Sequence, residues 1–141
     1  MAPAGIRGWT PFGNGTVGDW TCHVVDPVFW ALDLGAPATI VAQVKDYDPK
    51  TQGDAFPKGD IITYQFPARG AKPPVTLYWY DGGEHPADDL LQDVVALQKK
   101  TPQHGCLLGG EKGVIWTNPW NDDCHIQLKG EEKLVKVQGH E

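Results

Sequence analysis

Two residues that lie four apart have the side chains needed for proton transfer. Asp19 and His23 fall on one face of any helix through this segment, with Cβ atoms about 6 Å apart. A carboxylate beside an imidazole stabilises the protonated ring and orients it, which suits a general base acting on a substrate hydroxyl. A capping aspartate followed by an exposed histidine has the same spacing, so the pair alone leaves both interpretations open.

Residues 13–18 read Gly-Asn-Gly-Thr-Val-Gly and match the dinucleotide-binding pattern G-x-G-x-x-G. The setting argues against a phosphate loop. Residues 8–12 contain a glycine and a proline where a buried parallel strand is required, and a helix that begins at Asp19 places a carboxylate where the phosphate would bind. We therefore interpret the motif as a flexible turn before a capped helix.

The elements that must position Asp19 and His23 follow from periodicity. A helix is predicted over residues 19–34, ended by Gly35 and Pro37, with Pro27 starting a new turn or a kink. At 100° per residue, one face is apolar and the opposite face carries the candidate pair with Asp26 and Trp30. The apolar face is formed by Trp20, Val24, Val25, Val28, Phe29 and Leu32.

Strand signals follow the helix at residues 38–44, 61–66 and 75–80, separated by loops. A short helix is predicted over residues 88–100, a hairpin over 106–108 and 114–117, and a last strand at 133–137. Strands joined by loops rather than helices indicate an α+β fold, a predominantly antiparallel β-sheet with helices on one face. We expect one domain, residues 1–141, with no internal boundary.

Composition narrows the possible partners. The net charge of −6, without a basic stripe, argues against a nucleic-acid partner, and no apolar run reaches the length of a membrane span. The three cysteines are odd in number and irregularly spaced, so we do not expect a disulfide framework. We expect a cytoplasmic, reducing location instead. The six tryptophans fit core and loop packing, or a sugar-handling surface.

Three pairs of soft ligands could contribute to a metal site: Cys22-His23, His104-x-Cys106 and Cys124-His125. None has the C-x₂₋₄-C spacing of structural zinc sites, and adjacent residues on a helix point about 100° apart. Buried cysteines and surface histidines explain these pairs better.

Residues 6–115 contain a series of motifs in fixed order: Arg7-Gly8-Trp9, Gly15-x-x-Gly18-Asp19-x-x-Cys22-His23 continuing to Leu32, Phe56-Pro57-Lys58, Ile61-Ile62-x-Tyr64-x-Phe66-Pro67-Ala68-Arg69-Gly70, Pro73-Pro74-Val75, Trp79-Tyr80-Asp81-Gly82-Gly83 and Gly110-Glu111-Lys112-Gly113. This ordered series resembles the C-terminal domain of bacterial Gfo/Idh/MocA oxidoreductases. The similarity is faint beyond Trp116.

The resemblance implies a sugar or polyol oxidoreductase. In this family a Rossmann domain binds NAD or NADP, and the sheet domain completes the substrate pocket. The family's D-x-x-x-H pair falls on Asp19 and His23, so the histidine is expected to take the hydroxyl proton and the aspartate to orient it. The Rossmann half is expected in trans, because these residues do not provide it. The resemblance also implies a homo-oligomer formed through the sheet.

The sequence departs from the family pattern beside this pair. Relatives carry glycine two residues after the aspartate, whereas this chain has Thr21, preceded by Trp20. A side chain at that position narrows the expected pocket and puts turnover in question. The alternative interpretation is a non-catalytic oligomerisation or carbohydrate-binding module derived from such an enzyme.

Overall fold

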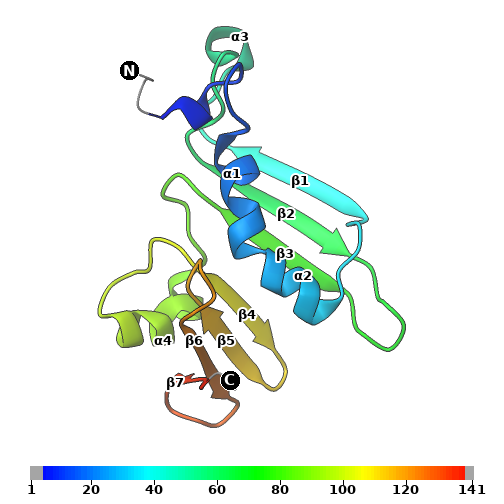
Figure 1. Ribbon diagram of the computed structural model, residues 1–141, viewed down its shortest axis with the longest axis vertical. Helices are drawn as coiled ribbons and strands as arrows, with labels where there is room; N and C mark the ends of the chain where they lie inside the picture. The colour runs from blue at the N-terminus through cyan, green and yellow to red at the C-terminus, as the bar shows by residue number, and fades with distance from the viewer. Residues whose placement is uncertain (1–4, 139–141) are drawn as a thin grey trace. The chain divides into compact units, whose positions relative to one another are not determined.

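The computed structural model describes residues 5–138 and has an α+β architecture with two antiparallel sheets (Figure 1). The chain divides into two compact units. One contains residues up to 22 and 26–85, and the other contains residues 23–25 and those from 86 onward. The elements are η1 (Ile6–Gly8), α1 (Gly15–Val24), α2 (Asp26–Leu32), β1 (Thr39–Val44), α3 (Pro49–Gln52), β2 (Asp60–Phe66), β3 (Val75–Tyr80), α4 (Asp88–Gln98), β4 (Cys106–Gly110), β5 (Gly113–Thr117), β6 (Cys124–Leu128) and β7 (Val135–Lys136).

The first unit is built on a three-stranded sheet in the order β1-β2-β3. The three strands lie within one residue of their predicted positions, and both pairings are antiparallel, as expected. Opposed residues share a face, so Ala42, Ile62 and Trp79 lie on one side of the sheet. Val41, Thr63 and Tyr78 lie on the other.

Helices α1 and α2 cover one face of this sheet (Figure 1). The helical segment breaks after Val24 and starts again at Asp26, because Pro27 has no N–H to continue the first helix, and this confirms the predicted new turn. Val28 is buried, and the Phe29 ring meets Phe66 edge-on with centroids 5.5 Å apart. Trp30, on the predicted polar face, is 83% exposed.

The second unit packs α4 with a four-stranded sheet in the order β4-β5-β6-β7. The predicted hairpin is present, but its strands are longer than expected and a two-residue turn, Glu111-Lys112, joins them. Its core includes Leu91 and Val94 from α4 and Trp116 from β5. Strand β7 is shorter than the predicted strand at 133–137.

The expectation of one sheet is wrong, and β6 is the physical reason. This strand pairs with both β5 and β7, so the C-terminal hairpin completes a sheet of its own. The sequence does not indicate β6 because its inward residues are polar: His125 and Gln127 are buried, whereas Leu128 is exposed.

No helix in the described residues is long and apolar enough to cross a bilayer.

The open end of the β2–β3 hairpin carries two close carboxylates. Asp81 accepts a hydrogen bond from the Asp60 backbone N–H at 2.8 Å and another from the Trp79 indole N–H at 3.1 Å. The Asp60 Oδ1 atom is buried without a hydrogen-bond partner. Burial, with a contribution from the Asp81 charge, raises the pKa of Asp60 from its ordinary 3.8.

This arrangement predicts a stabilising substitution that depends on pH. An acid whose pKa is raised on folding contributes stability at low pH that is lost as pH rises through the folded-state pKa. Asp60→Asn should therefore raise the melting temperature at pH 7 by about 3 °C, with a smaller gain near pH 4, where the wild-type acid is partly protonated. Thermal melts across this range measure the difference. The exposed Asp54→Asn is the matched control, and an equal gain at both pH values would contradict the prediction.

Candidate functional site

Helix α1 carries both candidate residues, but it begins four residues before the predicted cap. Gly15 starts the helix at φ 69°, in the left-handed region, and the Phe56 ring lies directly against it. A Cβ atom at this glycine would lie 3.0 Å from that ring. Asp19 is therefore inside the helix rather than at its cap, and the prediction of a flexible turn over residues 13–18 is wrong for residues 15–18.

Each glycine of the G-x-G-x-x-G match is in contact with this chain itself. A Cβ at Gly13 would overlap the Arg7 backbone, and one at Gly18 would overlap the Asn14 side chain. All strand pairings in the described residues are antiparallel, so the motif lacks the βαβ setting of a dinucleotide site. The three glycines are therefore explained by contacts within this chain.

Asp19 is held by an arginine that the spacing argument did not single out. Arg7, on η1, places its Nε 3.0 Å from Asp19 Oδ2. The close approach of Gly13 to the Arg7 backbone brings the two segments together. The arginine is well exposed, and exposed ion pairs contribute at most about 1 kcal/mol. The pair therefore orients the carboxylate more than it stabilises the fold.

A shallow pocket of about 180 Å³ lies beside this ion pair. Its lining is mainly polar and glycine-rich: Arg7, Phe12, Gly13, Asn14, Gly18 and Asp19. The Phe12 side chain is 71% exposed. A carboxylate acceptor, a guanidinium donor and an aromatic ring are together suited to a small ring that carries hydroxyl groups.

His23 lies in the last turn of α1. It is exposed, and its ring meets the Trp120 ring edge-on with centroids 5.8 Å apart. The Asn121 side chain donates a hydrogen bond to the His23 carbonyl oxygen at 3.3 Å, which satisfies one carbonyl at the helix end. Asp19 and His23 thus share the helix expected for them, one turn apart.

Thr21, which departs from the family pattern, and the adjacent Cys22 lie in the same helix. Thr21 is half-buried, and its Oγ1 is buried without a hydrogen-bond partner. Cys22 is exposed, and its thiol lies 3.5 Å from the Asp19 carbonyl oxygen. The threonine hydroxyl therefore points away from solvent.

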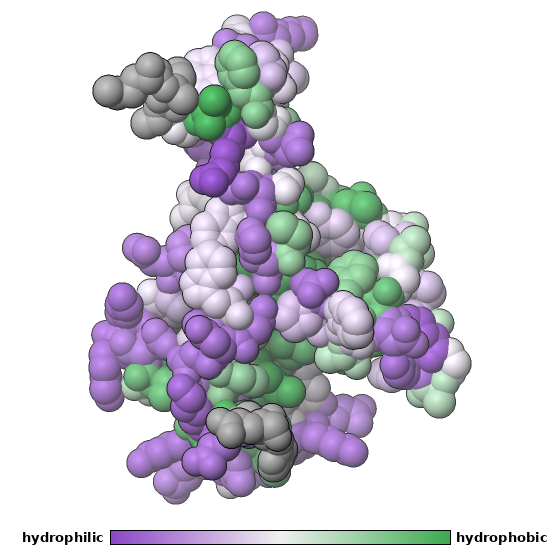
Figure 2. Space-filling view, in the orientation of Figure 1, coloured by the Kyte–Doolittle hydropathy of each residue, from purple (hydrophilic) through white to green (hydrophobic). Residues whose placement is uncertain are grey.

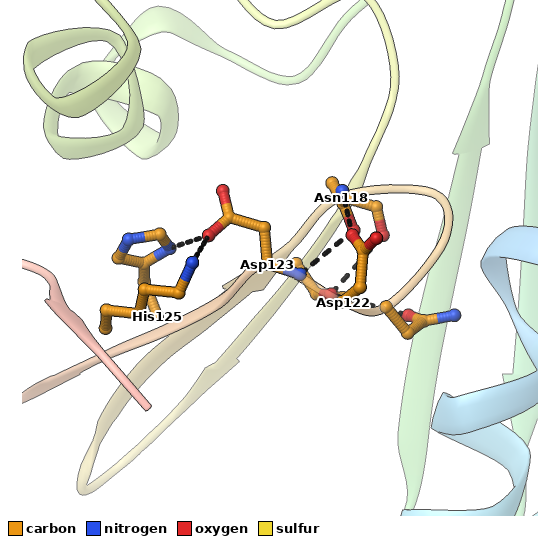
Figure 3. A network of polar contacts seen from close by, with 7 residues as sticks. Asn118, Asp122, Asp123 and His125 are labelled. Carbon is orange, nitrogen blue, oxygen red and sulfur yellow. Dashed lines mark hydrogen bonds and ion pairs between the residues drawn. The ribbon is translucent and has the colours of Figure 1, made fainter. Parts of the chain in front are cut away.

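A polar network in the second unit was not predicted. Asp123 Oδ1 lies 2.9 Å from the Lys136 amine and 3.8 Å from Nδ1 of His125 (Figure 3). The His125 ring is buried against Trp116, and its Nδ1 has no hydrogen-bond partner. The nearby loop is closed by a 2.7 Å hydrogen bond from the Asn118 amide to Asp122. The network ties β6 to β7 and to the loop before β6, and we assign it a structural role.

The cysteines do not gather into a ligand set. Cys106 on β4 and Cys124 on β6 both lie opposite Thr117 on β5, so a whole strand separates them. Burial raises the pKa of the Cys106 thiol to about 11, which keeps it protonated and unreactive at neutral pH. Within residues 5–138, no three His, Cys, Asp or Glu side chains lie close enough together to hold a metal ion.

A larger depression of about 370 Å³ lies at the other end of the first sheet. Its lining contains no ionisable side chain: Ala38, Gln65, Phe66, Pro67, Pro74, Val75 and Thr76. It therefore offers no acid, base or nucleophile, and the candidate site remains the helix α1 with the pocket beside Asp19.

Comparison with protein-family models, with curated proteins and with solved structures found no match to this chain.

The contact between Gly13 and Arg7 is open to a direct test. Gly13→Ala places a methyl group into the Arg7 backbone and should lower the free energy of unfolding by about 1–3 kcal/mol, the usual range for overpacking. Chemical denaturation measures the loss. Gly8→Ala is the matched control, because no atom lies within 4 Å of a Cβ built there. Equal stability of the two variants would show that the contact is not tight.

Proposed function

We propose that this chain is the substrate-side domain of an NAD(P)-dependent sugar or polyol oxidoreductase of the Gfo/Idh/MocA type. The observation that carries the proposal is the position of Asp19 and His23 one turn apart on α1, with Asp19 lining a polar pocket. An antiparallel sheet covered on one face by helices agrees with the architecture that the sequence resemblance implies.

The chemistry assigned to these residues is proton transfer and orientation. His23 is exposed and takes the proton of a substrate hydroxyl as the general base. Asp19 Oδ2 is engaged by Arg7, so its Oδ1 is the oxygen that holds a neighbouring substrate hydroxyl. NAD or NADP, bound by a Rossmann domain outside these residues, would be the acceptor of the hydride from the substrate carbon.

The proposal predicts that this chain alone does not bind the cofactor. The G-x-G-x-x-G match lacks a βαβ unit, and the Phe56 ring lies against Gly15, so we expect no phosphate loop here. Titration of the purified chain with NADH or NADPH, followed by cofactor fluorescence, should show no saturation in the low micromolar range. A known dehydrogenase in the same buffer is the positive control. Saturable binding would contradict the assignment of cofactor binding to another domain.

The catalytic role is tested in an enzyme assembled with a Rossmann half and assayed on cyclic sugars and inositols. His23→Ala should lower kcat by about 10²–10⁴-fold, because a positioned base contributes that much, with little change in cofactor affinity. Asp19→Asn should have a milder effect. His104→Ala, at another exposed histidine, is the matched control.

Two outcomes separate the candidate functions. Unchanged turnover in His23→Ala would end the catalytic assignment. If the wild-type assembly has no turnover and Thr21→Gly does not restore it, the second candidate applies, a non-catalytic carbohydrate-binding module. The exposed Phe12 ring beside Arg7 and Asp19 favours that module, since sugars stack on such rings.

A further inference from the structure

The loop between β5 and β6 carries an exposed tryptophan beside the proposed base. Trp120 is 62% exposed, although tryptophan side chains are highly buried on average. Its ring meets the His23 ring edge-on with centroids 5.8 Å apart, and both residues belong to the second unit. Trp120 lies outside the motifs that resemble the oxidoreductase family, so the resemblance assigns it no role.

Hydrogen bonds hold this loop, residues 118–123, in one conformation. The Asn118 backbone N–H donates to the Asp123 carbonyl oxygen at 3.2 Å, which closes the loop. Asn121 adopts the left-handed conformation, with φ 60°, and its side chain donates to the His23 carbonyl oxygen at 3.3 Å. This last bond ties the loop to the residue whose ring the indole contacts. The spacing of the two rings is therefore set by the loop as well as by the side chains themselves.

The surroundings of the indole are hydrophilic. Asn121 and Asp122, which follow Trp120 in the chain, are both exposed. In Figure 2 the atoms over the β5–β6 loop are mainly white and purple rather than green. An apolar partner would bury the neighbouring amide and carboxylate groups without hydrogen bonds, which costs free energy. A ring that carries hydroxyl groups offers C–H groups to the indole and hydrogen-bonding groups to its polar neighbours.

We propose that Trp120 determines substrate specificity by stacking on the C–H face of a cyclic polyol or sugar, with a hydroxyl of that ring directed toward His23. This inference rests on the proposed function, because His23 is the base assigned there. A ring holds its C–H groups in a fixed arrangement, whereas an open-chain polyol must immobilise several rotatable bonds to present such a face. Trp120 should therefore favour ring-form substrates over open-chain polyols.

Binding to the full chain tests the stacking directly. Isotope-labelled protein is titrated in two-dimensional NMR with myo-inositol and with sorbitol, which have the same number of carbons and hydroxyls. The indole N–H signal of Trp120, assigned with Trp120→Phe, should shift and saturate with myo-inositol in the millimolar range. The affinity for sorbitol should be weaker by about five-fold or more, because its chain loses more conformational freedom on binding.

Variants distinguish stacking from a general effect on the fold. Trp120→Ala should weaken the affinity for myo-inositol by about three- to ten-fold, followed through the backbone signals of the same loop. Trp120→Phe keeps an aromatic face and should lose less. Trp30→Ala is the matched control, because it removes a tryptophan of the first unit that is 83% exposed, and it should leave the affinity unchanged. Circular dichroism checks that each variant is folded.

Failure of this inference and failure of the proposed function give different results. Equal affinity for the two ligands, or equal weakening by Trp120→Ala and Trp30→Ala, would overturn the role of Trp120 whatever the turnover. Ring-selective binding at this loop in an assembled enzyme without turnover would end the oxidoreductase proposal and leave the binding role of Trp120 standing. In an active assembly, Trp120→Ala should raise KM for cyclic substrates more than it lowers kcat, and an unchanged KM would contradict stacking.

Discussion

The first unit depends on the anchoring of its N-terminal segment to residues 53–56. Trp9 and Ala55 form an antiparallel bridge, Phe56 donates its backbone N–H to the Gly8 carbonyl at 2.8 Å, and Thr10 donates to the Asp54 carbonyl at 3.0 Å. These bonds bring the Phe56 ring against Gly15, where α1 starts. The direction of α1, and with it the placement of Asp19, follows from this short pairing. The ion pair with Arg7 depends on the same anchor, because Arg7 lies in the anchored segment.

Much of the fold was predictable because the relevant signals are local. The strands β1 to β3 are rich in β-branched and aromatic residues, and α4 combines an apolar stripe with acids at its start, so pattern and propensity agree. The start of α1 was missed because glycines suggest a turn, and nothing local shows that Phe56 packs on Gly15. The strand β6 was missed because its buried positions are polar. Gln127 is satisfied by the Glu131 carbonyl oxygen at 3.1 Å, a partner that a periodicity argument does not include.

The candidate site likewise has a part that the sequence predicts and a part that it does not. The spacing of Asp19 and His23 predicts that they lie one turn apart once a helix is accepted. Their contacts cannot be predicted from the spacing, since Arg7 is twelve positions from Asp19 and Trp120 is almost a hundred from His23. The Arg7-Gly8-Trp9 motif was the one feature of the sequence that drew attention to Arg7. The motif does not identify the carboxylate with which the arginine forms an ion pair. Long-range contacts of this kind depend on loop conformation, which composition alone does not determine.

Gly59 and Gly82 approach backbone to backbone at the open end of the β2–β3 hairpin, and Gly82 has φ 63°. This contact fixes the register in which β2 pairs with β3. If β3 slipped by two residues, a residue with a side chain would replace Gly82 against Lys58 and Gly59, and the overlap would exclude that pairing. The Asp60–Asp81 backbone hydrogen bond at 3.1 Å would be lost as well. Backbone sterics at this end of the hairpin therefore exclude the competing register independently of side-chain packing.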